Sequence, residues 1–112
     1  MKVSAIFRNL NWDEAMELPA KLNAEKHLGF DDWYLPDINE LFLMFDKKTG
    51  KPKPELKDMK GLWFWSSSSY ATHASFAWYV YFGDGYVNYG DKNDDYAARC
   101  VRRTCKLEAK IK

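Results

Sequence analysis

Apolar side chains in the first half of the chain recur with the period of a helix in two places. The first predicts a helix over residues 12–28, one face of which carries Trp12, Ala15, Met16, Pro19 and Leu22. Asn11 is a good N-cap and Glu14 completes a capping box, so the helix is expected to begin here. Pro19 lacks a backbone donor and is expected to kink the helix or end its first part. Gly29 supplies a stop.

The second helical pattern is shorter. Asp37 and Glu40 form another capping box, which precedes an amphipathic helix of about ten residues. Its apolar positions are Ile38, Leu41, Phe42 and Phe45. They are expected to pack against a sheet that carries Phe76, Trp78 and Val80.

The second half of the chain predicts strands separated by polar turns. Strands are expected over residues 62–65, 76–82, 86–89 and 96–104, with an edge strand over residues 2–7. Residues 83–85 form a hairpin turn between two of them. Polar loops are expected over residues 47–60, 66–75 and 90–95. Two helices followed by a cluster of strands are typical of an α+β fold, with the helices packed on a mostly antiparallel sheet.

Composition sets the size and the charge of the molecule. The 112 residues are expected to form one domain, spanning residues 1–112. Aromatic residues make up 17% of the chain, more than a small core can enclose, so some rings are expected at a binding surface. The net charge of +1 does not steer the protein towards nucleic acid or membrane. No apolar run is long enough for a membrane span, and Arg8 interrupts the only candidate for a signal peptide.

Several short motifs together resemble one known family. The motifs are Trp-Asp-Glu-Ala at residues 12–15, Leu-Asn at 22–23, Gly-Phe-Asp-Asp-Trp-Tyr-Leu-Pro at 29–36, Glu-Leu at 40–41, Trp-Phe-Trp-Ser-Ser-Ser-Ser at 63–69, Ala-Trp at 77–78 and Arg-Cys-Val-Arg at 99–102. They are similar to the Lcl C-terminal domain family of bacteria and phages, from about residue 11 to residue 103. The resemblance implies a C-type-lectin-like fold, which mostly displays a variable binding surface. It implies no particular ligand.

The chain departs from that family at two points. The family's usual Asp-Trp-Arg-Leu-Pro carries Tyr34 in place of the arginine, so a structural ion pair made by that arginine would need a substitute. The family's cysteine in Arg-Cys-Val-Arg often pairs with one on the first helix, but residues 12–28 contain none. Cys100 and Cys105 would face opposite sides of one strand, so pairing them needs a turn. Free thiols fit a reducing compartment, which favours the cytoplasm.

The loops of the C-terminal half are the best candidates for a binding site. Tyrosine gives a large contact area at a small entropy cost, while serine and asparagine adapt their hydrogen bonds. In related receptor proteins with this fold, sequence diversification falls on the same region. The candidate binding residues are Ser68, Tyr70, His73, Tyr86, Asn88, Tyr89, Asp91 and Asn93. The alternative is that these segments are ordinary solvated turns.

The tryptophans allow two interpretations. Trp33, Trp63, Trp65 and Trp78 could form a stacking platform for sugars or bases, but a core cluster is expected for Trp33, Trp63 and Trp78. The reason is that Trp78 shares one strand face with other large apolar side chains. Trp65 borders the serine-rich segment and stays open between the two.

Other chemistries have weaker support. Asp91, Asn93, Asp94 and Asp95 offer oxygen ligands, but their spacing matches no calcium loop, so no metal or cofactor is expected. Cys100 and Cys105 have the spacing of the two active-site cysteines of formylglycine-generating enzymes, and thiolates can hold copper(I). The family motif accounts for Cys100 without catalysis. Residues 47–60 hold six lysines that could touch phosphates, but no aromatic residues are interleaved, so nucleic acid is not the expected partner.

The sequence therefore predicts a non-catalytic binding protein whose partner is a protein. One concrete form is a phage- or prophage-encoded inhibitor that blocks a host defence machine in the cytoplasm. An accessory carbohydrate-binding or adhesin domain is the alternative, and a copper–thiolate oxidase is the third possibility. The oligomeric state stays open.

Overall fold

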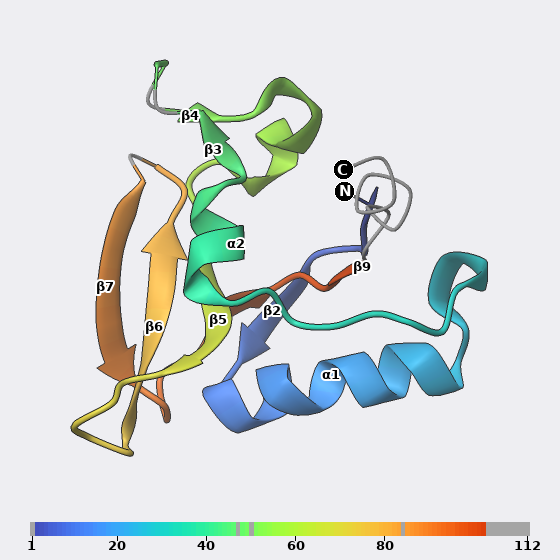
Figure 1. Cartoon of the computed structure of the whole chain (residues 1–112), viewed down its shortest axis with the longest axis horizontal. Helices are drawn as coiled ribbons and strands as arrows, with labels where there is room; N and C mark the ends of the chain where they lie inside the picture. The colour runs from blue at the N-terminus through green and yellow to red at the C-terminus, as the bar shows by residue number, and fades with distance from the viewer. Residues whose placement is uncertain (1, 47, 50, 84, 103–112) are drawn as a thin grey trace, which may run out of the picture.

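The computed structural model describes residues 2–46, 48–49, 51–83 and 85–102, and within them it has an α+β architecture. A mostly antiparallel sheet has the strand order β2 (Phe7–Leu10), β8 (Tyr96–Ala98), β5 (Trp63–Ser69), β6 (Phe76–Tyr81), β7 (Tyr86–Asp91). Only the β5–β8 pairing among these is parallel. Two short antiparallel pairs flank the sheet: β1 (Lys2–Val3) with β9 (Val101–Arg102), and β3 (Phe45–Asp46) with β4 (Lys51–Pro52). Figure 1 shows α2 lying across β5 and β6, with α1 on the side of β2.

Helix α1 spans Trp12–Ala24 and begins at the predicted capping box. The side chain of Asn11 accepts the N–H of Glu14, and Glu14 accepts the N–H of Asn11, each at 2.9 Å. The helix continues through Pro19, because Leu18 and Leu22 are both buried and hold the two flanking turns in place. The predicted apolar face was wrong at Met16, which is exposed.

The chain leaves the helix four residues earlier than predicted. A 3₁₀ turn, η1 (His27–Gly29), follows α1, with left-handed backbone at Lys26, Leu28 and Gly29. Gly29, at φ +88°, therefore ends η1 and not α1.

Helix α2 spans only Ile38–Phe42, half the predicted length. Its capping box between Asp37 and Glu40 is confirmed. The chain then turns, and Phe45 enters β3, where it is paired with Pro52. The predicted packing is confirmed for Leu41 and Phe45, which are buried with Val80 of β6, and for Ile38, which is partly buried against the same cluster. It was wrong for Phe42, which is half-buried and lies outside this cluster.

The two faces of the sheet carry two buried clusters. On the face towards α1, Trp65 and Tyr79 pack with Leu18 and Leu22. On the other face, Phe64 and Val80 pack with side chains of α2 and of a second 3₁₀ segment, η2 (Pro54–Met59). Leu56 and Met59 of η2 are buried, so the described part of residues 47–60 is not the solvated loop that was predicted.

The strand boundaries also differ from the prediction. Residues 66–69 continue β5, because Ser69 pairs with Ala77 of β6 beyond an irregularity in the register. At this irregularity the hydroxyl of Ser66 donates to the carbonyl of Trp78 at 2.7 Å. Residues 90–91 belong to β7, not to a turn. The predicted strands at residues 2–7 and 96–104 are each broken in two, and their described parts meet through Ser4 and Cys100. None of the helices in the described part of the chain is long and apolar enough to cross a bilayer.

Candidate functional site

Five aromatic side chains meet at one end of the sheet and form the candidate site. We call this group the aromatic cluster: Tyr70, His73, Phe76, Trp78 and Tyr89. They come from the loop after β5, from the start of β6 and from β7. The shared position follows from the register, which places Trp78 of β6 opposite Tyr89 of β7.

The rings contact one another closely. Tyr70 stacks on Tyr89 with centroids 4.2 Å apart and 30° between the ring planes. Tyr70 also lies 5.4 Å from Trp78, and Trp78 meets Tyr89 edge-on at 5.6 Å. His73 lies parallel to Tyr70 at 6.0 Å, and Phe76 meets His73 at 5.7 Å. Such ring pairs stabilise one another beyond their burial, so the cluster is a preorganised surface.

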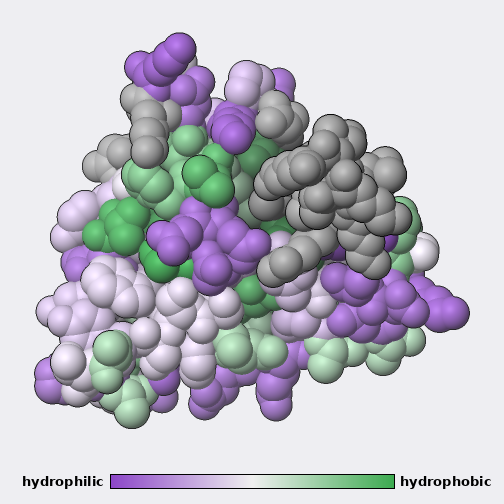
Figure 2. Space-filling model, viewed as in Figure 1, coloured by the Kyte–Doolittle hydropathy of each residue, from purple (hydrophilic) through white to green (hydrophobic). Residues whose placement is uncertain are grey.

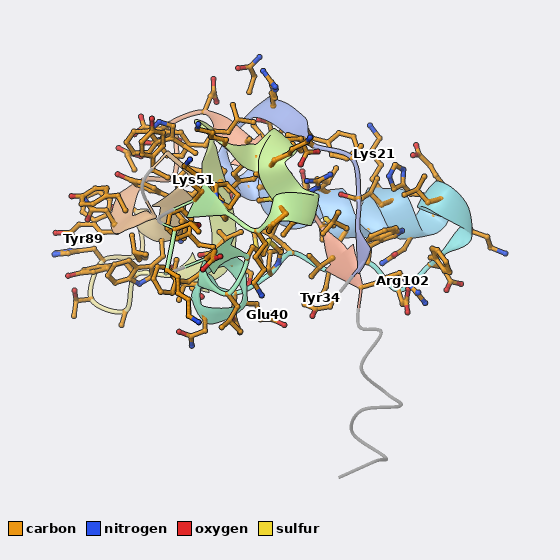
Figure 3. The ribbon with its side chains drawn as sticks, turned by 90° about the horizontal axis from the view of Figure 1, so that it is seen from above. Lys21, Tyr34, Glu40, Lys51, Tyr89 and Arg102 are labelled. Carbon is orange, nitrogen blue, oxygen red and sulfur yellow. The ribbon has the colours of Figure 1, made fainter. Side chains whose placement is uncertain are left out.

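The aromatic cluster is partly open to solvent. His73 is exposed, Tyr89 is 39% exposed, and the other three rings are half-buried. None of the five belongs to the buried clusters on either face of the sheet. Tyr89 lies at one end of the molecule, far from Lys21 and Arg102 (Figure 3).

The cluster contains three of the predicted binding residues, Tyr70, His73 and Tyr89. Tyr86 and Asn88 lie on the opposite face of β7, because side chains alternate along a strand. There the Asn88 amide donates to the Tyr86 hydroxyl at 2.8 Å. These two residues are therefore separate from the cluster.

The remaining candidates have local structural roles. The hydroxyl of Ser68 accepts the N–H of Ile38 at 3.0 Å, so it helps to hold the start of α2. The carboxylate of Asp91 accepts the N–H of Asn93 at 2.9 Å and closes the turn after β7. Within the described residues, no three His, Cys, Asp or Glu side chains gather in a way that could hold a metal ion.

Phe76 and Trp78 are the members that sequence reasoning assigned to the core. They are only half-buried, because the facing part of β5 carries small serines and α2 is only five residues long. The burial of Trp33 is confirmed, and Trp65 is also buried. Trp63 was wrongly assigned, because it is 37% exposed.

Trp63 belongs to a second group of aromatic rings, which lies on the same face of the sheet as Tyr79. Its centroid lies 4.7 Å from Tyr81 of β6 and 5.7 Å from Tyr96 of β8. Because β5 runs between these two strands, the indole has a neighbouring ring on the strand on each side. Trp63 is therefore packed among tyrosine rings and is still 37% exposed.

The Arg-Cys-Val-Arg motif joins distant parts of the chain. The guanidinium of Arg99 is buried, makes two hydrogen bonds of 3.0 Å to the carboxylate of Asp58 in η2, and donates to the carbonyl of Ser4. Arg102 makes two hydrogen bonds to Asp32, at 2.6 and 3.0 Å, and lies over the ring of Phe30. The motif therefore has a structural role, because its two arginines connect the end of the chain's described part to Ser4, Asp32 and η2.

Two further motifs are also structural. The amide of Asn23 makes two hydrogen bonds to the backbone of Trp33, which joins α1 to the segment that precedes α2. Tyr34, where the family resemblance implies an arginine, makes two backbone hydrogen bonds of 2.9 Å with Val101 and donates its hydroxyl to Glu40 at 2.7 Å. The side chains of Tyr34 and Glu40 lie next to each other in Figure 3.

The family model of the Lcl C-terminal domain matches residues 2–102. The chain belongs to the Lcl C-terminal domain family. No curated protein matches the sequence. In this member of the Lcl C-terminal domain family the shared motifs hold the scaffold together, whereas the aromatic cluster lies largely outside them. Family membership therefore explains the scaffold and leaves the ligand to be inferred from the cluster.

Burial also lowers the reactivity of the Cys100 thiol. Its thiol is buried and unpaired, and burial raises its pKa from 9.0 to about 12. A neutral thiol is a poor nucleophile and a poor metal ligand. Cys105, the other half of the suggested copper pair, lies outside the described residues.

Proposed function

We propose that the chain is a non-catalytic binding protein that contacts a protein partner through the aromatic cluster. The observation that carries the proposal is the contact of Tyr70, Trp78 and Tyr89 outside the buried clusters of the sheet. Tyrosine and tryptophan are the side chains most enriched in the centres of protein interfaces. Contiguous apolar patches at the surface of a protein mark interaction sites, and this partly exposed cluster is of that kind.

The loop that carries Tyr70 supports a preorganised site. The N–H of Tyr70 donates to the carbonyl of Phe76 at 2.9 Å, and the N–H of Phe76 donates to the backbone carbonyl of His73 at 3.1 Å. The carbonyl of Ser75 accepts the N–H of Lys92 at 2.9 Å, which joins this loop to the turn after β7. Fewer side chains must be ordered on binding, so the entropy cost is low.

A more specific form of this function is a phage- or prophage-encoded inhibitor that covers a working surface of a host defence protein. Two points support it: the resemblance is to a family that phages as well as bacteria carry, and Cys100 is unpaired, which suits a reducing cytoplasm. In this form, the aromatic cluster blocks its target by occupying a surface and performs no chemistry.

A glycan is the second candidate ligand of the same cluster. Tyr89 and His73 each present an exposed ring with a polar tip, which is the combination that a sugar ring can stack against and hydrogen-bond. A protein partner is favoured because the rings already stack on one another, which leaves a continuous patch and not an open slot.

The proposal is tested by comparative capture from a bacterial lysate. Tagged wild-type protein, Tyr89→Ala and Tyr86→Ala are immobilised in parallel, and the captured proteins are identified by mass spectrometry. The proposal expects a protein that the wild type and Tyr86→Ala retain and that Tyr89→Ala loses. A glycan array probed with the same three proteins tests the second candidate. If glycan binding depends on Tyr89 and no such protein is captured, the chain is a glycan-binding protein and the proposal is wrong.

A further inference from the structure

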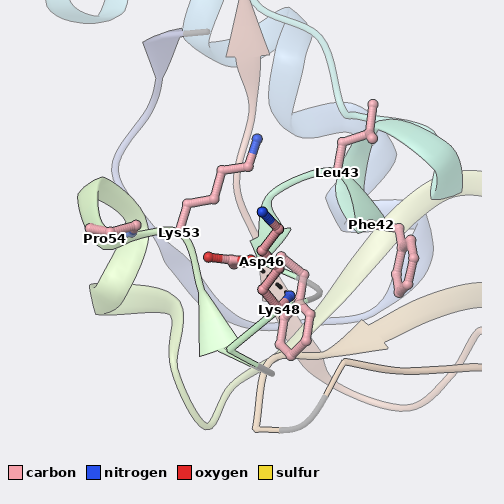
Figure 4. Close-up of a pocket in the computed structure, with 7 residues that line it drawn as sticks. Phe42, Leu43, Asp46, Lys48, Lys53 and Pro54 are labelled. Carbon is pink, nitrogen blue, oxygen red and sulfur yellow. Dashed lines mark hydrogen bonds between the residues drawn. The ribbon is translucent and has the colours of Figure 1, made fainter.

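An apolar groove lies between α2 and the start of η2, away from the aromatic cluster. Its lining residues are Phe42, Leu43, Phe45, Asp46, Lys48, Lys53 and Pro54 (Figure 4). Leu43 is 59% exposed and Phe42 is half-buried. In Figure 2, hydrophobic side chains gather over α2 and β3 on this face of the molecule. The groove thus presents apolar surface to solvent beside charged side chains.

The floor of the groove is fixed to the core. The rings of Phe42 and Phe45 stack with 16° between their planes and 6.5 Å between their centroids. Phe45 in turn meets the buried ring of Phe82 edge-on at 6.0 Å. The N–H of Lys53 donates to the carbonyl of Met44 at 3.0 Å, which joins the two walls. A ligand would therefore meet a preformed surface.

The rim of the groove is net positive, because its lining has two lysines, Lys48 and Lys53, against one carboxylate, Asp46. Residues 46–60 contain six lysines against three acidic residues, and one of these, Asp58, is engaged by Arg99. Lys48 and Lys53 line the groove itself. The adjoining hollow shares Asp46 and Pro54 with it and adds Lys51, Lys57 and Lys60. An exposed apolar floor with a lysine rim is complementary to a segment that combines apolar and acidic side chains.

We infer that this groove binds an acidic amphipathic segment of a protein. An apolar side chain of the segment covers Leu43 and Phe42, and its carboxylates face Lys48 and Lys53, as in the docking of a helix in a groove. This inference does not depend on the aromatic cluster.

Two other occupants fit the groove less well. The chain's own residues 103–112 carry four basic residues against one acidic residue, so they repel the lysine rim. Nucleic acid would match the lysines, but the most exposed apolar side chain of the groove, Leu43, is aliphatic and offers no ring on which a base could stack. The half-buried ring of Phe42 is already stacked on Phe45.

The test uses the full chain and a synthetic probe. The probe is a fluorescent peptide of about sixteen residues, with leucines at helical i, i+3, i+4 and i+7 spacing and glutamates elsewhere. Its two controls are the same peptide with lysine for glutamate and a glutamate-rich peptide without leucine. A short DNA duplex serves as the polyanion control. Fluorescence anisotropy gives the affinities, and backbone NMR shifts locate the bound probe.

Two variants and two matched controls connect binding to the groove. Leu43→Ser and Lys53→Glu should each weaken the probe by about tenfold or more. The control for Leu43→Ser is Leu28→Ser, which removes a leucine that is 63% exposed in η1, beyond the C-terminal end of α1 (Figure 1). The control for Lys53→Glu is Lys21→Glu, which reverses an exposed charge on α1. Both should bind the probe like the wild type, and so should Tyr89→Ala.

The expected result is binding of the acidic amphipathic probe alone, with NMR shifts at Leu43 and Lys53. Four results would overturn the inference: no binding of the probe, equal binding of either peptide control, equal binding of the DNA duplex, or binding that survives Leu43→Ser. Since Tyr89→Ala leaves this probe unaffected, failure here is distinct from failure of the proposed function.

Discussion

Tyr70 and Tyr89 stack at 4.2 Å although they come from different elements, the loop after β5 and strand β7. The contact depends on two hairpins that place three consecutive strands side by side. It turns two separate tyrosines into one surface, which Trp78 extends at 5.4 and 5.6 Å. The candidate site is therefore a product of the sheet and not of one loop.

The bond between Tyr34 and Glu40 should stabilise the capping box of α2. Glu40 accepts the N–H of Asp37 with one oxygen and the hydroxyl of Tyr34 with the other. Tyr34→Phe removes one charge-assisted hydrogen bond, so the free energy of unfolding should fall by about 1–3 kcal/mol. Tyr34→Arg, the family's residue, should recover much of the loss by pairing with Glu40. Urea denaturation measures both, and a Tyr34→Phe variant as stable as the wild type would show that the bond contributes nothing.

The two arginine–aspartate pairs should differ in their contribution to stability. Asp58→Ala leaves the buried guanidinium of Arg99 without its carboxylate, so the free energy of unfolding should fall by about 1–3 kcal/mol. Asp32→Ala should cost less, because Arg102 is more exposed and water replaces the lost partner. Parallel urea titrations compare the two variants. The reverse order of losses would contradict the structural role assigned to the buried Arg99.

Leu41 and Phe42, which are neighbours in α2, should also differ in their contribution to stability. Leu41 is fully buried against β6, and Leu41→Ala should reduce the free energy of unfolding by about 2–5 kcal/mol. Phe42 is half-buried at the edge of the groove, so Phe42→Ala should cost clearly less, although it removes the larger side chain. Thermal and urea unfolding of both variants check this order. Equal losses would mean that Phe42 belongs to the core.

Stability should fall at alkaline pH. Burial raises the pKa of Cys100 from 9.0 to about 12, and burial together with Asp94 raises the pKa of Tyr96 from 10.0 to about 12. The unfolded chain therefore releases these protons first, and the stability present below about pH 9 is lost as the pH rises towards 12. Cys100→Ala and Tyr96→Phe should each flatten this decline in the free energy of unfolding. If the free energy of unfolding falls as steeply with pH in both variants as in the wild type, the raised pKa values of Cys100 and Tyr96 are contradicted.

Local signals in the sequence predicted much of the fold. Both capping boxes begin helices where Asn11 and Asp37 stand, because each depends on residues three positions apart. The order of the strands depends on distant segments, and no local pattern indicates that β8 lies between β2 and β5. The C-type-lectin-like assignment stays a prediction of the family resemblance.

The candidate site was only partly accessible to sequence reasoning. Residue types in the loops pointed to Tyr70 and Tyr89, and the register then united them. The same register separates Tyr86, because alternation sends it to the other face of β7. The partial exposure of Trp78 and of Trp63 could not be foreseen, since it depends on where α1 and α2 leave the sheet uncovered.

The central claim is that a protein partner binds at the aromatic cluster, and a titration of the captured partner tests it most directly. The wild type is compared with Tyr89→Ala and with Tyr86→Ala, which removes a tyrosine that is 51% exposed on the opposite face of the same strand. The account predicts that Tyr89→Ala weakens binding by about 2 kcal/mol or more and that Tyr86→Ala binds like the wild type. The melting temperatures of the three proteins should be similar. Unchanged binding by Tyr89→Ala, or an equal loss in Tyr86→Ala, would contradict it.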